Sequence, residues 1–229
     1  MTSVSVAVMA HPKRAAMVDD LLGRLDRRVE VVWDEVNDRH DTGIRAIQAA
    51  DMSATHHLVI QDDVVPCRDL IAGVEQALEH VPEGRPASFY IGRVMPFRRK
   101  VDEAVRAARG CSWVTMDGVY WGPAIAIPTS TIPEISEYWP KSKWTNYDRR
   151  LSKWFEFHGR ECWYSWPSLV EHRGDESLVW DGKAKRTAHR FTGIHGSALD
   201  LDWSGRVAVM HDTSELDRRR QRRAMAGAR

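Results

Sequence analysis

The stretch His56–Asp63 reads HHLVIQDD, a short apolar strand that runs directly into two adjacent carboxylates. Its centre, Leu58–Ile60, is apolar and includes the β-branched Val59 and Ile60, which is typical of a strand in a buried sheet. Ligands of open α/β sheets bind beyond the carboxyl ends of the strands. Asp62 and Asp63 therefore predict a ligand site at this strand end. The alternative is structural: one Asp caps a helix that begins near Cys67, and the other faces solvent.

Strand and helix patterns alternate on both sides of this stretch. The chain from residue 3 to residue 9 alternates apolar and polar side chains, whereas residues 14–25 carry apolar side chains at helical spacing. We expect strands at residues 3–9, 29–33, 56–60 and 88–91, and helices at residues 14–25, 43–54 and 70–78. This order predicts an α/β fold with a mostly parallel central sheet and helices on both faces.

The second half of the chain has a different pattern. Residues 113–127 are rich in β-formers and are broken by Gly118 and Gly122. We expect short helices at residues 129–138 and 146–158 and a strand-like segment at 161–166. Residues 168–172 follow a proline, and residues 174–205 show no strong periodicity. No repeat or low-complexity linker divides the chain. We therefore expect one domain over residues 1–213, with two halves of different pattern (1–110 and 111–213), and a basic tail (214–229).

The composition excludes several classes of protein. The chain has 229 residues, 43% of them hydrophobic and 28% charged, which is ordinary globular usage and argues against disorder and fibrous repeats. No stretch approaches the ~20 apolar residues of a membrane span, and the first residues lack the pattern of a leader, so we expect a cytoplasmic protein. Three cysteines without a Cys-x-x-Cys argue against a disulfide framework and a thiolate zinc site.

The net charge of +1 conceals a basic chain end. Residues 218–229 hold six arginines and no acid, which leaves 27 basic and 32 acidic side chains in residues 1–217. The run Arg218–Arg223 could contact nucleic-acid phosphates without sequence preference. Its alternative is a solvated tail, which is the commoner role of a charge run.

Two further loops follow strands of the same predicted sheet. Ala10, His11, Pro12 and Arg14 lie in the loop after the first strand (AHPKR), and Asp34 ends the second strand, where a carboxylate can accept hydrogen bonds from a base or ribose. The chain has no Gly-x-Gly-x-x-Gly and no Gly-Lys-Ser/Thr loop, which argues against a Rossmann dehydrogenase and a P-loop NTPase. These loops predict a nucleotide site of another type, or else ordinary surface.

Charge near the acidic pair indicates what it could bind. Adjacent carboxylates repel each other unless donors or a cation neutralise them, and a divalent cation that bridges phosphate oxygens is the usual solution. Arg45, on the predicted helix 43–54, would lie near the pair and could bind a diphosphate. Its alternative is a solvated helical arginine. Lys185 could likewise contact a diphosphate or be exposed.

The order of these elements resembles the GT-A glycosyltransferases. Gln61-Asp62-Asp63 takes the place of the family's D-x-D motif, with Gln in the first position. Residues 121–128 (WGPAIAIP) resemble the strand beside the family's acceptor pocket. Residues 146–151 (NYDRRL) resemble the helix start that carries a catalytic base. Residues 167–177 (PSLVEHRGDES) resemble a late P-x-L-x-x-H-x-G-x-x-S stretch. The resemblance spans roughly residues 3–177, and it implies a nucleotide-sugar-binding half (1–110) and an acceptor-binding half (111–213).

The resemblance implies a fold, an activity and roles for single residues. It implies a Rossmann-like GT-A fold that transfers a sugar from a nucleotide-diphosphate sugar to a hydroxyl, with Mn²⁺ or Mg²⁺ held by Asp63 and His172. It implies an inverting reaction in which Asp148 is the base, although an N-terminal helix carboxylate is the structural alternative. Trp121 and Gly122 would contact the acceptor, although core packing is the ordinary role of Trp121. The donor would contact Ala10, His11, Pro12, Arg14, Asp34, Arg45, Asp62 and Lys185.

Two rival functions remain open from the sequence. One is a metal-dependent phosphoryl-transfer or hydrolytic enzyme that uses Asp62, Asp63 and His172. The other is a nucleic-acid-binding module led by Arg218–Arg223. The basic tail can also be combined with the sugar-transfer hypothesis, because some bacteriophages encode glycosyltransferases that act on a modified base in DNA. Such an enzyme would work in the host cytoplasm, and protein or glycan acceptors are equally open.

Overall fold

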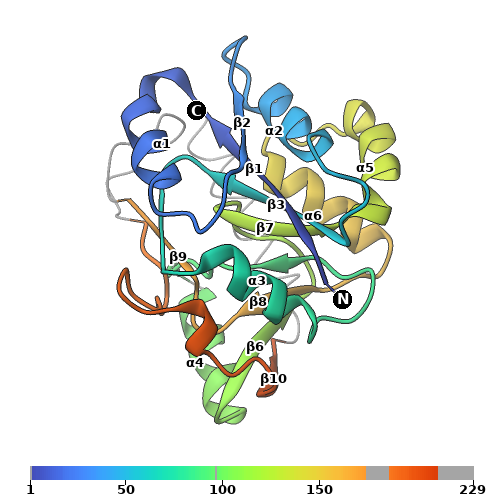
Figure 1. Ribbon diagram of the computed structural model, residues 1–229. Coiled ribbons are helices and arrows are strands. Elements are labelled where there is room, and N and C mark those ends of the chain that lie inside the picture. Colours follow the sequence, from blue (N-terminus) through green and yellow to red (C-terminus); the bar gives the residue numbers. More distant parts are fainter. Residues whose placement is uncertain (1, 96, 174–185, 211–229) are drawn as a thin grey trace.

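The computed structural model describes residues 2–95, 97–173 and 186–210. Its main feature is an eight-stranded sheet in the order β10-β6-β8-β5-β7-β3-β1-β2 (Figure 1). The strands are β1 (Val4–Ala10), β2 (Glu30–Trp33), β3 (His56–Gln61), β4 (Val64–Pro66), β5 (Ala87–Ser88), β6 (Cys111–Met116), β7 (Ala124–Pro128), β8 (Cys162–Ser165), β9 (Val170–His172) and β10 (Arg206–Val209). The α-helices are α1 (Ala15–Leu22), α2 (Arg39–Gln48), α3 (Leu70–Leu78), α4 (Phe97–Ala107), α5 (Ile132–Tyr138) and α6 (Tyr147–Phe157).

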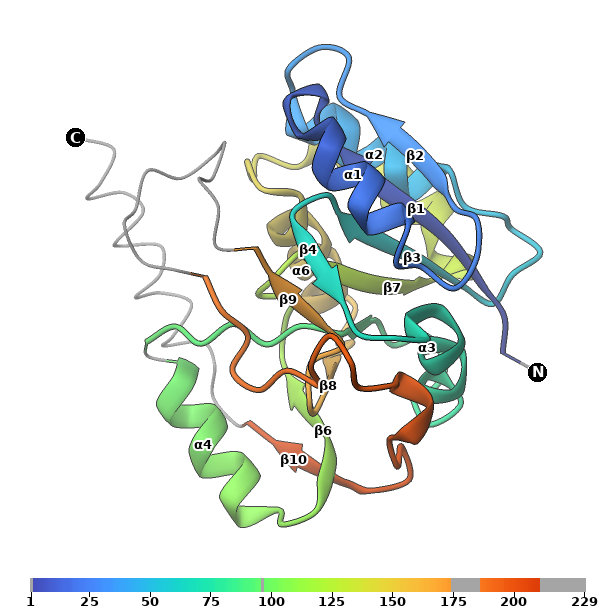
Figure 2. The ribbon, with the colours of Figure 1, turned by 60° about the vertical axis from the view of Figure 1, so that its left-hand side comes forward.

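The first half forms the parallel part of this sheet. β1 pairs in parallel with β2 on one side and with β3 on the other. Helices α1 and α3 lie on one face of these strands, and α2, α5 and α6 lie on the other (Figure 1 and Figure 2). The predicted α/β fold with helices on both faces is confirmed. The carboxyl ends of β1, β2 and β3 therefore open on the same edge of the sheet.

The second half adds a mixed part to the sheet. β7 runs antiparallel to both β3 and β5, β8 is parallel to β5 and antiparallel to β6, and β10 is parallel to β6. Four of the seven strand pairings of the described sheet are thus parallel. Because β7 is antiparallel, it starts beside the point where β3 ends, which places the Gly118–Pro123 loop near the Asp pair.

A small second sheet lies where β3 leaves the main one. β4 pairs antiparallel with β9, and Val64 stands opposite His172. The new strand thus begins at the residue that directly follows the Asp pair. This pairing brings a segment more than 100 residues further along the chain to the Asp pair.

Several local features differ from the predictions. α2 begins at Arg39 rather than at Gly43, because Asp38 caps it by accepting from His40 N at 2.7 Å. β5 is limited to Ala87–Ser88, and within the predicted strand Ile91 N donates to a side chain, Ser168 Oγ, instead of to a strand backbone. Helix α4 and strands β4, β9 and β10 were not predicted. Residues 214–229, Arg218–Arg223 and Lys185 lie outside the described residues.

The core runs through both parts of the sheet. Strands β3, β6 and β7 carry fully buried side chains over most of their length, which explains the apolar runs in the sequence. All three cysteines are buried free thiols. Of the helices in the described ranges, none has both the length and the apolar character needed to cross a membrane.

Burial of two adjacent histidines at the start of β3, His56 and His57, makes the free energy of unfolding depend on pH. Burial lowers the pKa of His56 from 6.5 to about 4, and it also lowers the pKa of His57. Between pH 6.5 and 4 the unfolded chain therefore binds protons that the folded chain does not. We expect the free energy of unfolding to decrease as the pH falls through this range, by up to about 1.4 kcal/mol per pH unit and histidine.

The variant His56→Gln tests this dependence in urea unfolding curves recorded from pH 7 to pH 4. Its free energy of unfolding should decrease less steeply than that of the wild type, because one of the two protons is no longer bound on unfolding. His195→Gln, at an exposed position, is the control and should keep the wild-type slope. Equal slopes for wild type and His56→Gln would contradict the assignment.

Candidate functional site

A single arginine bridges the two carboxylates at the end of β3. Arg14 Nη1 lies 2.8 Å from Asp62 Oδ1 and 2.7 Å from Asp63 Oδ2. The backbone N–H of His11 donates to Asp62 Oδ2 at 2.8 Å. The three charged side chains are 11%, 7% and 8% exposed, so the contacts are largely removed from water. The repulsion that the sequence predicts within the pair is therefore offset by a side chain of the loop after β1.

In the cluster of Arg14, Asp62 and Asp63, burial and charge pairing shift the pKa values in opposite directions. Burial raises the pKa of Asp62, and the Arg14 guanidinium and the His11 N–H act in the opposite direction. Burial alone would lower the pKa of Arg14, but the charges of Asp63 and Asp62 more than compensate, and the net shift is upward. Arg14 therefore remains a cation that is held between two partners. Within the contacts of the described residues, one guanidinium therefore faces two carboxyl groups.

The small sheet places His172 against Asp63. Arg173 N donates to Asp63 O at 2.8 Å, next to the Val64–His172 pair of the ladder. His172 Nε2 then lies 3.4 Å from Asp63 Oδ2, with both side chains almost fully buried. His172 Nδ1 lies 2.7 Å from Arg173 O. A carbonyl oxygen only accepts, so Nδ1 carries a proton, and Nε2 is the ring nitrogen that faces the Asp63 carboxylate.

Two buried atoms of this site have no hydrogen-bond partner among the described residues: Asp63 Oδ1 and His172 Nε2. An unpaired acceptor in a buried position is costly unless a proton or a cation occupies the space in front of it. Carboxylate oxygen and imidazole nitrogen suit Mn²⁺, and oxygen suits Mg²⁺. These two side chains fit a divalent cation. No set of three His, Cys, Asp or Glu side chains gathers as a metal site within the described ranges. Most ligands would therefore come from a bound phosphate or from water.

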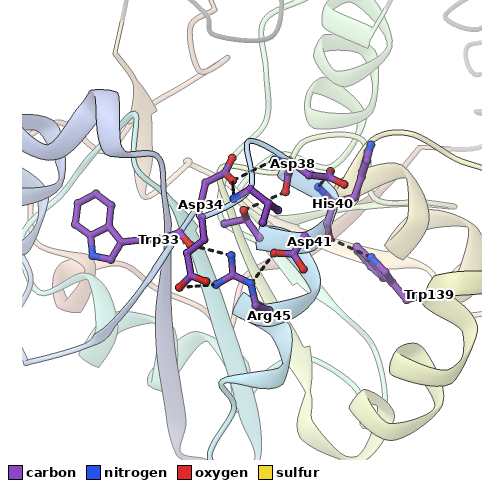
Figure 3. Close-up of polar contacts among 10 residues, drawn as sticks. Trp33, Asp34, Asp38, His40, Asp41, Arg45 and Trp139 are labelled. Carbon is purple, nitrogen blue, oxygen red and sulfur yellow. Dashed lines mark hydrogen bonds and ion pairs between the residues drawn. The ribbon is translucent and has the colours of Figure 1, made fainter.

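The loop after β2 adjoins the loop after β1. Asp34 N donates to Ala10 O at 2.7 Å, and Asp34 Oδ1 accepts from the backbone N–H groups of Val36 and Asp38 at 3.2 and 3.1 Å. Figure 3 shows Asp34 at the centre of this loop. His11 Nε2 lies 3.4 Å from Asn37 Oδ1 and so reaches across to it. The predicted nucleotide loops thus lie side by side, and one carboxyl oxygen of Asp34 holds its own loop in shape.

Arg45 also belongs to this corner of the sheet. Its Nε donates to Asp41 Oδ2 at 2.7 Å, its Nη2 donates to Trp33 O at 2.8 Å, and its Nη1 lies 3.8 Å from Glu35 Oε1 (Figure 3). We expected Arg45 near the acidic pair. Its polar contacts among the described residues are instead at the end of β2, where it ties α2 to the strand. The contacts account for Arg45 as a structural residue, and a role toward a diphosphate stays a prediction.

The first turn of α6 reaches the same end of β3. Tyr147 OH donates to Gly122 O at 2.6 Å, and both residues are buried. A Cβ on Gly122 would lie 2.6 Å from Tyr147 Cε1 and 2.8 Å from Gln61 Nε2. Glycine is therefore the only residue type at position 122 that lets Gln61 and Tyr147 approach the backbone so closely. The predicted base, Asp148, follows Tyr147 directly and is half-buried, and its Oδ1 accepts from Arg149 N at 2.8 Å.

The other predicted acceptor residue lies in the core. The Trp121 ring packs edge-on against Phe97, Tyr120 and Tyr164 and is 9% exposed. A Cβ on Gly92 would lie 2.5 Å from Trp121 Nε1, so the backbone also approaches the ring closely. These contacts are those of a core side chain, the ordinary role that the sequence left open for it.

Sequence reasoning missed several polar side chains around the site. Tyr147 was not predicted as a site residue, although Asp148 beside it was. Its position opposite Gly122 depends on the fold and has no sequence signal. Glu171 Oε1 accepts from His172 N at 2.9 Å and from Ala188 N at 2.6 Å, which fixes β9. Tyr90 faces the same charges: burial raises its pKa, Glu171 and Asp63 raise it further, and Arg186 lowers it. No sequence motif marks these residues.

Comparisons with known proteins add a structural similarity. No family model matches the chain, and no curated protein matches it. Among solved structures, the chain is similar to a Drosophila β-1,4-galactosyltransferase 7 in complex with manganese, UDP-Gal and xylobiose. The two chains share 10% identity with a TM-score of 0.42, over 82% of this chain and 71% of the other. A similarity of this size carries no argument about activity, which must rest on the residues of the site.

Replacing Gly122 tests the junction of β3, β7 and α6. In Gly122→Ala the added methyl group would overlap Tyr147 and Gln61, and such overpacking typically costs about 1–3 kcal/mol of unfolding free energy. Gly23→Ala is the matched control, because its Cβ would meet nothing closer than 3.5 Å. Urea unfolding should show a clear loss for the first variant and none for the second. Equal free energies of unfolding for Gly122→Ala and Gly23→Ala would contradict the close approach of Tyr147 and Gln61 to Gly122.

Proposed function

We propose that the protein is a metal-dependent glycosyltransferase that moves a sugar from a nucleotide-diphosphate sugar to an acceptor hydroxyl. The observation that carries the proposal is a pair of buried atoms at the carboxyl end of β3, Asp63 Oδ1 and His172 Nε2, that lack a hydrogen-bond partner among the described residues. A ligand that supplies phosphate oxygens and a cation would satisfy both atoms. The resemblance of Gln61-Asp62-Asp63 and of the His172 segment to GT-A motifs agrees with this role.

The donor half of the site would be built from the three strand ends. Asp63 and His172 would hold Mn²⁺ or Mg²⁺, which when bound offsets the charge that develops on the leaving diphosphate. Asp62 is held by Arg14 and by His11 N, and would keep the loop after β1 in place rather than bind the ion directly. Ala10, His11, Pro12 and Asp34 would surround the nucleotide, with the base and ribose beside Asp34.

The acceptor half would be built on the first turn of α6. The acceptor hydroxyl is a weak nucleophile, so a base must take its proton as the new bond forms. Asp148 would hold that proton on its carboxylate, as an inverting mechanism requires. Gly122 would place α6 against Gln61, because Tyr147 bonds to its carbonyl. The acceptor hydroxyl would belong to a protein, a glycan or a modified base in DNA.

The arrangement favours this function over a phosphoryl-transfer or hydrolytic enzyme that uses the same acidic residues. Such an enzyme needs no nucleotide site and no separate acceptor base. In this chain the loops after β1 and β2 adjoin the Asp pair through His11, Ala10 and Asp34. The half-buried carboxylate of Asp148 stands on the neighbouring helix start. Both features are accounted for by a donor and an acceptor that react side by side.

Asp63→Asn tests the donor site. Wild-type protein should gain thermal stability from a nucleoside diphosphate with Mn²⁺ and less from either alone, by mass action on the folded state. The variant keeps the shape of the side chain but loses the anionic ligand, so we expect the Mn²⁺-dependent gain to disappear. Asp19→Asn, an exposed carboxylate of α1, is the control and should respond like the wild type. The gain is measured as Tm in a panel of UDP, GDP, CDP and ADP. An undiminished gain in Asp63→Asn would remove Asp63 from the site.

Asp148→Asn tests the acceptor base. The amide cannot accept the hydroxyl proton, and loss of a general base typically lowers turnover by about 10²–10⁴-fold. Donor affinity should stay within about twofold of the wild type, because the donor contacts lie on other elements. Turnover is measured as sugar transfer to an acceptor or, at a lower rate, to water. Near-normal turnover would exclude Asp148 as the base and favour a retaining mechanism.

A further inference from the structure

We propose that Arg14 is an internal competitor for the cation, so that the metal site becomes available only when a diphosphate draws the guanidinium away. This inference rests on the proposed function, since it concerns how the same site binds its metal. It assigns to Arg14 a positioning role rather than a chemical one. Its consequence is that Mn²⁺ binds weakly without nucleotide and tightly with it.

The competition follows from where Arg14 donates. A single nitrogen, Nη1, contacts Asp63 Oδ2 at 2.7 Å and Asp62 Oδ1 at 2.8 Å. The same Asp63 Oδ2 is the atom that lies 3.4 Å from His172 Nε2. A cation shared by Asp63 and His172 would therefore stand within a few ångströms of the guanidinium. All of these side chains are at most 11% exposed, so water screens the repulsion poorly.

The position of Arg14 explains how a diphosphate would relieve the competition. Arg14 ends the 3-10 turn η1 (Pro12–Arg14), in the loop where we place the nucleotide. A guanidinium has five N–H donors and binds phosphate oxygens in a bidentate manner. A bound diphosphate offers it new partners while adding ligands for the cation. Binding of the two is then mutually favourable, and by linkage each raises the affinity of the other by the same factor.

Mn²⁺ titrations without nucleotide, followed by the electron paramagnetic resonance signal of the free ion, test the inference. Arg14→Gln removes the competing charge and should bind Mn²⁺ at least about tenfold more tightly than the wild type. Arg14→Lys keeps a charge and should stay near the wild type. Arg24→Gln is the matched control, because it removes an exposed arginine of the same chain region that pairs with Asp20, and should leave Mn²⁺ affinity unchanged. Repeating the titrations with UDP should raise the wild-type affinity more than that of Arg14→Gln.

The outcomes separate this inference from the proposed function. Asp63→Asn should abolish Mn²⁺ binding in both the wild-type and the Arg14→Gln background. Equal affinities of wild type and Arg14→Gln, both lost with Asp63→Asn, would overturn the competitor role and leave the metal site intact. Absence of Asp63-dependent binding in every variant would overturn the metal site and the competitor role together. If Arg14→Gln does not fold alone, rescue of its folding by MnCl₂ but not by KCl of equal ionic strength supports the inference. Lack of such rescue counts against it.

Discussion

The contact of Arg14 with Asp62 and Asp63 is the interaction on which the site depends. It joins the loop after β1 to the end of β3 and offsets a carboxylate pair that the apolar strand has carried into a buried position. Buried ion pairs contribute little net stability, because removing charges from water costs about as much as their attraction returns. Replacement of a buried ion pair by apolar side chains of similar volume often leaves stability unchanged or raises it. Two buried carboxyl groups that face one guanidinium at a strand end are better explained by binding than by folding.

Segments that are distant in the sequence meet around this contact. The β4–β9 pair brings His172 to Asp63, and the antiparallel β7 brings Gly122 and, through it, the start of α6 to Gln61. Each approach is made by backbone pairing or by a glycine, so the side chains have little freedom to vary their positions. A cation and a diphosphate on one side, and a hydroxyl and its base on the other, would then face each other across the end of β3.

The sequence predicted the parts of the fold that local pattern determines. The strand ending in the Asp pair, the alternation of the first half and the start of α6 follow from hydrophobic period and order. The ion pairs of Arg14 with Asp62 and Asp63 could not be predicted in this way. The partners lie 48 and 49 residues away, and no local pattern marks the pairing. Helix α4 was missed although Phe97 and Val101 are buried at helical spacing, since charged residues surround them. Trp121 was predicted as an acceptor residue but packs in the core. An aromatic residue beside a glycine has the same local sequence in a core as at a sugar-binding site.

The central claim is that Asp63 and His172 hold a divalent cation together with a nucleoside diphosphate. The most direct measurement is anomalous diffraction at the manganese edge from crystals grown with Mn²⁺ and UDP, with GDP in a parallel set. The account predicts one anomalous peak within coordination distance of the Asp63 carboxylate and His172 Nε2, with diphosphate oxygens completing the shell. Diphosphate bound at the ends of β1 and β3 with no peak between Asp63 and His172, or a peak on other residues, would contradict it.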